Sequence, residues 1–140
     1  MGACGQSLWR PDELKAGTMS GGISIHCVDV ASGRVATGLK VALHRLDPQG
    51  EPIADPLAQG EVGSTGQLQH PSLSGDAIDV GGYEAVFWVG DFYRSQGTAL
   101  PKPAFLERVV YRFHISDPAQ HYHLPFKFTA WGYSLFRGGA

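Results

Sequence analysis

Residues 121–129 alternate between apolar and polar side chains, and this period of two predicts a β-strand with one buried face. The apolar positions are Tyr122, Leu124, Phe126 and Phe128. His121 and His123 lie on the other face. Because the apolar face must pack against a core, we expect both histidines to point toward solvent or a partner. A turn at residues 131–132 and a second extended segment over residues 133–137 follow.

Shorter alternating patterns, separated by turn residues, recur through the rest of the chain. The segments with a strand pattern are residues 23–28, 39–44, 83–89 and 106–116. The 19 glycines and nine prolines supply the turns between them. Asp91 can cap a short helix over residues 92–96, which Gly97 would close. We therefore predict a single all-β domain, a sandwich of about seven strands with one short helix.

Charge and composition exclude several classes of partner. The net charge of −2 and the lack of a basic run argue against a nucleic-acid partner. No window approaches the roughly 20 apolar residues of a membrane span, so no membrane partner is expected. Residues 1–21 show no periodicity and lack a secretory signal, and we expect a flexible arm before one domain over residues 22–140. These features favour a soluble, cytoplasmic protein.

A second histidine lies on the polar face of another predicted strand. Ile23, Ile25 and Cys27 alternate with Ser24, His26 and Val28, which places His26 opposite the isoleucines. From the residues alone, a strand histidine of this kind can be structural, exposed or catalytic. His121 and His123 could also bind a metal, but no third ligand is indicated, so we expect none. Pro125 lacks a backbone N–H, which favours an edge strand or a subunit seam.

Several motifs, in their order and spacing, resemble the 5-hydroxyisourate hydrolases, the enzymatic branch of the transthyretin fold. The motifs are Ser-Ile-His-Cys-Val-Asp at 24–29, the segments 38–46 and 105–118, His-Tyr-His-Leu-Pro at 121–125 and Gly-Tyr-Ser at 132–134. The resemblance covers roughly residues 22–140. It implies a transthyretin-like β-sandwich of roughly seven to eight strands and a homotetramer with its sites where subunits meet. It also implies hydrolysis of the lactam bond between N1 and C6 of 5-hydroxyisourate, a step of purine catabolism, with no cofactor.

The resemblance assigns catalytic roles to His26 and His123. We expect His121 to contact the substrate, and we expect Arg137, which belongs to the terminal motif, to contact the substrate or a subunit interface. One histidine, neutral near pH 7, would act as general base on a water that attacks the C6 carbonyl. The other would orient that water or stabilise the developing oxyanion. The assignment of both histidines to outward faces, made from periodicity alone, agrees with these roles.

The chain departs from the family at three positions expected to line the substrate pocket. Gln67 stands where the family has an arginine, and Phe136 and Gly139 stand where it has a tyrosine and a serine. A neutral amide cannot replace the fixed charge and the two-pronged hydrogen bonding of a guanidinium. The expected pocket is less charged and has more apolar space, which would suit a hydroxyisourate whose N–H groups carry methyls. Two alternatives are hydrolysis of the unsubstituted ring and a non-catalytic, transthyretin-like tetramer that binds a small molecule in its central channel.

Overall fold

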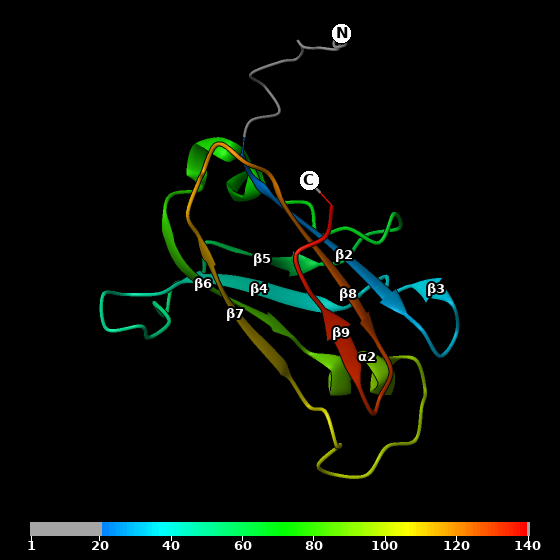
Figure 1. Ribbon diagram of the computed structural model, residues 1–140. Coiled ribbons are helices and arrows are strands. Elements are labelled where there is room, and N and C mark those ends of the chain that lie inside the picture. Colours follow the sequence, from blue (N-terminus) through cyan, green and yellow to red (C-terminus); the bar gives the residue numbers. More distant parts are fainter. Residues whose placement is uncertain (1–20, 140) are drawn as a thin grey trace, which may run out of the picture.

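Two four-stranded β-sheets pack face to face in the computed structural model, which describes residues 21–139 (Figure 1). The first sheet has the order β3-β2-β8-β9, with β3 at Arg34–Val35, β2 at Ile23–Asp29, β8 at Tyr122–Phe128 and β9 at Tyr133–Leu135. The second has the order β5-β4-β6-β7, with β5 at Ala58–Glu61, β4 at Lys40–Arg45, β6 at Gly81–Phe87 and β7 at Val109–Ile115. The predicted all-β sandwich is confirmed. The expected arm over residues 1–21 lies, except for Gly21, outside the described residues.

The inward faces of the two sheets form one core. Phe87 of β6 stacks on Phe126 of β8 with ring centroids 4.0 Å apart, which joins the sheets across the sandwich. In β2 and β8 the predicted apolar positions are buried, and His26 and His123 on the other face are half-buried. The face assignment from periodicity is therefore confirmed. No helix in the described part of the chain is long and apolar enough to span a membrane.

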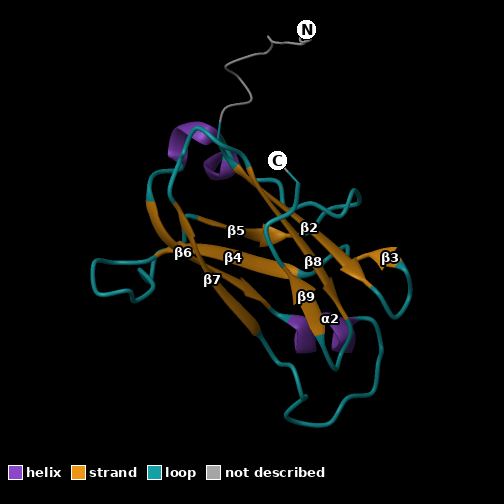
Figure 2. Ribbon diagram, in the orientation of Figure 1, coloured by secondary structure: helices purple, strands orange, loops and turns teal. Residues whose placement is uncertain are grey.

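The helical segments lie at the two ends of the sandwich (Figure 2). The predicted short helix is α2, Val89–Ser95, which begins three residues earlier than expected. The backbone N–H of Gly90 donates to the carbonyl of Glu107, so the chain turns directly after β6. Asp91 therefore lies in the first turn of α2 and is not the N-cap residue. Its negative charge there interacts favourably with the helix dipole. Two 3-10 turns that the sequence did not predict, η3 at Pro71–Leu73 and η4 at Gly75–Ala77, lie at the opposite end.

Strands β2 and β8 form a parallel pair at the centre of the first sheet. The register runs from Ile23 opposite Tyr122 to Asp29 opposite Phe128. The expectation that Pro125 marks an edge strand is wrong, because β9 pairs with the other side of β8. In β8 the odd-numbered residues 123, 127 and 129 direct their backbone N–H and C=O groups toward β9 and the tail that follows it. Pro125 belongs to the same set, so its missing N–H falls opposite Phe136. This explains why the regular part of β9 ends at Leu135.

Candidate active site

The candidate residues meet on the outward face of the first sheet, in two neighbouring rows. In one row Gln67 forms an isolated antiparallel β-bridge with His26, and His26 lies opposite Pro125 in β8. Continuing the β8–β9 register by one residue adds Phe136 to the same row. In the next row Ser24 lies opposite His123. Because directly opposite residues project from the same face of a sheet, these side chains surround a common surface.

Ser24 connects His123, which lies in β8, with His121, which lies just before that strand. Its hydroxyl oxygen lies 2.6 Å from Nδ1 of His123 and 2.9 Å from Nε2 of His121. Nδ1 of His121 in turn lies 2.9 Å from the carbonyl oxygen of Gly21. Both ring nitrogens of His121 are therefore engaged by the chain itself. His123 retains Nε2 as the ring nitrogen without a hydrogen-bond partner among residues 21–139.

His26 is positioned by the loop that carries Gln67. The backbone of Cys27 donates to the carbonyl of Gly66, and the backbone of Leu68 donates to the carbonyl of Ile25. Gly66 has φ +86°, and a Cβ there would come within 2.7 Å of Nε2 of His26. The loop can approach the imidazole this closely only because this residue is glycine. Neither nitrogen of His26 has a hydrogen-bond partner in the described part of the chain.

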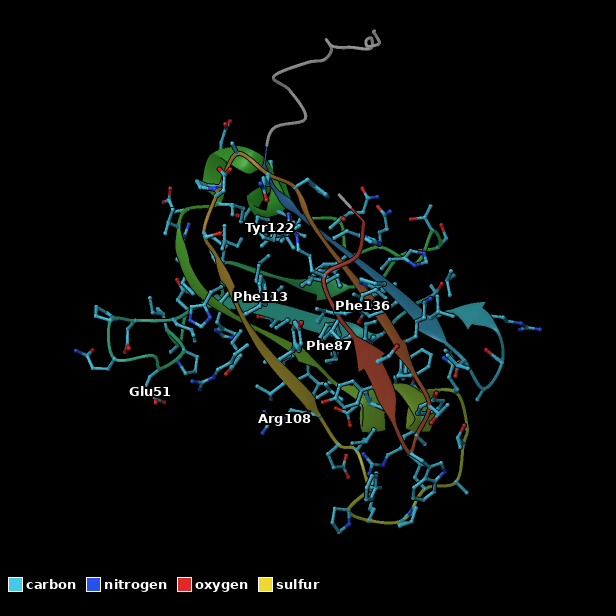
Figure 3. The ribbon with its side chains drawn as sticks, viewed as in Figure 1. Glu51, Phe87, Arg108, Phe113, Tyr122 and Phe136 are labelled. Carbon is cyan, nitrogen blue, oxygen red and sulfur yellow. The ribbon has the colours of Figure 1, made fainter. Side chains whose placement is uncertain are left out.

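The C-terminal tail closes the other side of the site. The backbone N–H of Gly138 donates to the carbonyl of His123 at 2.7 Å. A Cβ at Gly138 would lie 2.8 Å from Cδ2 of His123, so the tail passes directly against the ring. Phe136 is 48% exposed and Gly139 is exposed, so both are accessible to a ligand on this face. Figure 3 shows Phe136 on the tail segment that follows β9.

Arg137 is tied to the chain beside this face. Its guanidinium donates to the side-chain oxygen of Gln120 at 3.0 Å and to the carbonyl of His121 at 3.3 Å. It also lies 3.9 Å above the ring of Tyr122. The side chain is exposed, but in this arrangement it holds the tail against the start of β8. Its predicted contact with a substrate stays a prediction.

Electrostatics favour the neutral form of His123. Partial burial lowers the pKa of His123, and the nearby His26 and His121 lower it further. A neutral imidazole has a lone pair on one nitrogen and can accept a proton near pH 7. The pair His26 and His123 can thus carry general base and hydrogen-bond donor functions on one surface. In the described residues no three side chains of His, Cys, Asp or Glu are arranged to hold a metal ion.

A separate cavity of about 700 Å³ lies near α2 and contains none of the predicted site residues. Asp29 lines it, is buried, and accepts a hydrogen bond of 2.6 Å from the hydroxyl of Tyr93. This pair joins β2 to α2.

Cys27, the free thiol of β2, is buried in the core, and burial raises its pKa to about 12. The thiol is therefore not a nucleophile at neutral pH.

Sequence reasoning missed three residues that shape the site. Ser24 lies two residues before His26, so the period of two placed it on the same face, but its partners lie 97 and 99 residues away. Gly66 and Gly138 are required by close approaches of the backbone to His26 and His123. A glycine in a chain with 19 glycines gives no such signal by itself.

Known proteins with similar sequences cover nearly all of this domain. A model of the HIUase/transthyretin family matches residues 23–138. The 5-hydroxyisourate hydrolase 2 of Rhizobium meliloti is 41% identical over 119 residues, which are 85% of this chain and 97% of the relative. The 5-hydroxyisourate hydrolase of Ralstonia nicotianae is 36% identical over 118 residues, which are 84% of this chain and 98% of the relative.

Solved structures give the same fold. An (S)-allantoin synthase superposes with a TM-score of 0.76 at 31% identity over 86% of this chain, which spans 44% of that protein's length. The 5-hydroxyisourate hydrolase of Klebsiella pneumoniae superposes with a TM-score of 0.67 at 24% identity, over 85% of this chain and 94% of the relative. The second likeness supports the transthyretin-like sandwich alone.

Proposed function

Because this chain belongs to the HIUase/transthyretin family, we propose that it is a cyclic amide hydrolase that opens the six-membered ring of a hydroxyisourate in urate catabolism. The observation that carries the proposal is the placement of His26 and His123 in adjacent rows of one outward face. Both rings have nitrogens without partners among the described residues, so both are free to act on a ligand. The names of the relatives supply the substrate class.

His123 is the proposed general base. Its lowered pKa keeps it neutral near pH 7, and its Nε2 is the ring nitrogen without a hydrogen-bond partner among residues 21–139. Nε2 takes a proton from water as the water oxygen bonds to C6 of the substrate. His26 donates a hydrogen bond to the oxyanion that forms on the C6 carbonyl. When the C6–N1 bond breaks, the proton passes from His123 to N1, which leaves a carboxyl group at C6.

The surroundings of the histidines favour a substituted ring. At one end of the row Gln67 offers a neutral amide, and at the other the exposed ring of Phe136 offers apolar surface, while Pro125 between them is buried. An N-methyl group cannot donate a hydrogen bond and gains from apolar contact. We therefore assign an N-methylated hydroxyisourate as the preferred substrate, so that the enzyme acts in methylurate degradation, with the parent 5-hydroxyisourate as a slower substrate.

The catalytic assignment is tested by replacing the histidines. His26→Ala and His123→Ala should each lower kcat by on the order of 100-fold, because each removes a group that transfers or stabilises charge. The reaction is followed by circular dichroism of the ring-opened product, since uncatalysed opening gives a racemate. His114→Ala is the matched control, because His114 is an exposed strand histidine on β7 of the other sheet. Near-native rates in both site variants would leave the histidines as bystanders.

The substrate assignment is tested on fresh N-methylated and parent hydroxyisourate. The native chain should have the higher kcat/KM on the methylated ring. Gln67→Arg combined with Phe136→Tyr should shift the preference toward the parent ring by roughly 10- to 200-fold, the range for one methyl in an apolar pocket. Equal rates on both rings, or faster turnover of the parent, would contradict the methylated substrate and leave a hydrolase of the parent ring.

The alternative is a non-catalytic tetramer that binds a small molecule in its central channel. The observation that favours it is Gln67, a neutral amide at the position where the family carries an arginine. Calorimetry with a stable urate analogue distinguishes the two proposals when combined with the rate assay. Binding without enantioselective ring opening would support the alternative and exclude the hydrolase.

A further inference from the structure

Three groups in series connect the proposed base to the backbone. The carbonyl oxygen of Gly21, the ring of His121 and the hydroxyl of Ser24 lead to Nδ1 of His123, over contacts of 2.9, 2.9 and 2.6 Å. His121 is half-buried beside the first residues of β2, and both of its ring nitrogens are engaged by other groups of the chain. The direction of each hydrogen bond in this series follows from which groups can donate.

A carbonyl oxygen can only accept, so Nδ1 of His121 carries a proton and donates to Gly21. In a neutral His121 the other nitrogen, Nε2, then has the lone pair and accepts from the hydroxyl of Ser24. Once the hydroxyl proton is used, the oxygen of Ser24 must accept in its contact with His123. Nδ1 of His123 is therefore the protonated nitrogen, and the lone pair lies on Nε2.

We infer that Ser24 and His121 are positioning residues that fix His123 in the tautomer whose Nε2 accepts the proton of the attacking water. The bond of 2.6 Å also fixes the rotation of the ring and stabilises the imidazolium, because Ser24 can accept a stronger hydrogen bond from the charged form. In this respect the pair acts on His123 as the aspartate acts on the histidine of a serine-protease triad. The inference rests on the proposed function, because it assumes that His123 is the base.

The first test is the tautomer itself. Two-bond proton–nitrogen NMR spectra of ring-labelled protein at pH 7.5 should report a protonated Nδ1 and an unprotonated Nε2 for His123. In Ser24→Ala the same ring should change toward the other tautomer, since nothing then selects between them. A protonated Nε2 on His123 in the native chain would overturn the inference. This measurement needs no activity, so it can fail or succeed independently of the proposed hydrolysis.

The second test separates positioning from structure by kinetics. Ser24→Ala should lower kcat about 10- to 100-fold with little change in KM, because the binding surface remains while the base is misoriented. Ser24→Thr should restore most of the rate, since it keeps the hydroxyl and suits a strand. Ser134→Ala is the matched control, a serine on the same face in β9 opposite Lys127. Native kcat in Ser24→Ala would overturn the inference.

The contribution of His121 is tested with two substitutions. His121→Gln keeps an N–H donor for Gly21 and an oxygen acceptor for Ser24, and it should retain most of the rate. His121→Leu removes both groups, so the hydroxyl of Ser24 is no longer directed away from His123. This variant should approach the rate of Ser24→Ala. Equal rates in the Gln and Leu variants would contradict a role for His121 in setting the tautomer.

Discussion

At the scale of single residues, the lowered pKa of His123 determines how activity should depend on pH. A base must be unprotonated to act, and partial burial together with His26 and His121 disfavours its protonated form. The acid limb of kcat/KM should therefore have its midpoint below about 6.5, the ordinary value for histidine. A pH–rate profile of the native chain measures this midpoint. A midpoint above the ordinary value would contradict the assignment of His123 as the base.

The same shift links pH to stability, with a definite sign. Because the folded pKa of His123 lies below its unfolded value, the unfolded chain takes up this proton at a higher pH than the folded chain does. The contribution of His123 to stability is therefore present above the unfolded pKa and is lost as pH falls through the folded pKa. The variant His123→Gln should lose less stability than the native chain between pH 7 and pH 5, as measured by urea denaturation.

The sequence predicted the directions of the site residues and not their partners. Alternation in β2 and β8 correctly placed His26 and His123 on outward faces, because burial follows a period of two in a half-buried strand. It could not place Ser24 against His123, because the parallel pairing joins residues far apart in the chain. The register of such a pair depends on the packing of both sheets, which a single strand pattern does not encode.

At the scale of elements, the C-terminal tail follows β9 as an irregular segment and passes directly against the ring of His123. Gly138→Ala would place a Cβ 2.8 Å from Cδ2 of His123, so the tail or the ring must move. Because a small displacement of a catalytic group slows the reaction strongly, kcat should fall by up to about 100-fold while the melting temperature changes little. Stopped-flow rates and calorimetry check the two parts.

Gly132→Ala is the control for the tail. It lies in the turn between β8 and β9, and a Cβ there meets nothing within 4 Å. This variant should keep the native rate. A native rate in Gly138→Ala as well would show that the tail can relax away from His123, and the close approach would then have no role in orienting the ring.

Elements were predicted best where burial alone determines them. The strands around His26 and His123 were predicted correctly. Helix α2 begins before Asp91, the residue expected to cap it, because the fully buried Val89 continues the apolar segment of β6. Pro125 was expected at an edge and lies in a central strand. The proline rule concerns the missing N–H, and here that gap falls opposite Phe136, where the ladder with β9 is already ending.

At the scale of the whole molecule, we predict a homotetramer, the assembly that the family resemblance implies. Large apolar side chains are exposed on the edge strands β7 and β9 and beside the site, among them Val110, Tyr133 and Phe136. Light scattering in physiological salt should give about four times the chain mass of 15.0 kDa. A monomer at micromolar concentration would contradict a site that neighbouring subunits complete. The outward face of the first sheet around His26 and His123 would then be the whole binding surface.

The parallel pairing of β2 with β8 also has a consequence in time. Ser24 and His123 are separated by 99 residues, so their contact forms only after most of the chain has been made and folded around it. Secondary structure in the hairpins of the second sheet can form earlier, because β4 and β6 need only nearer segments of the chain. During refolding from urea, enzymatic activity should therefore recover later than the far-ultraviolet circular dichroism signal. Catalysis by this chain would then report that its last strands have joined its first.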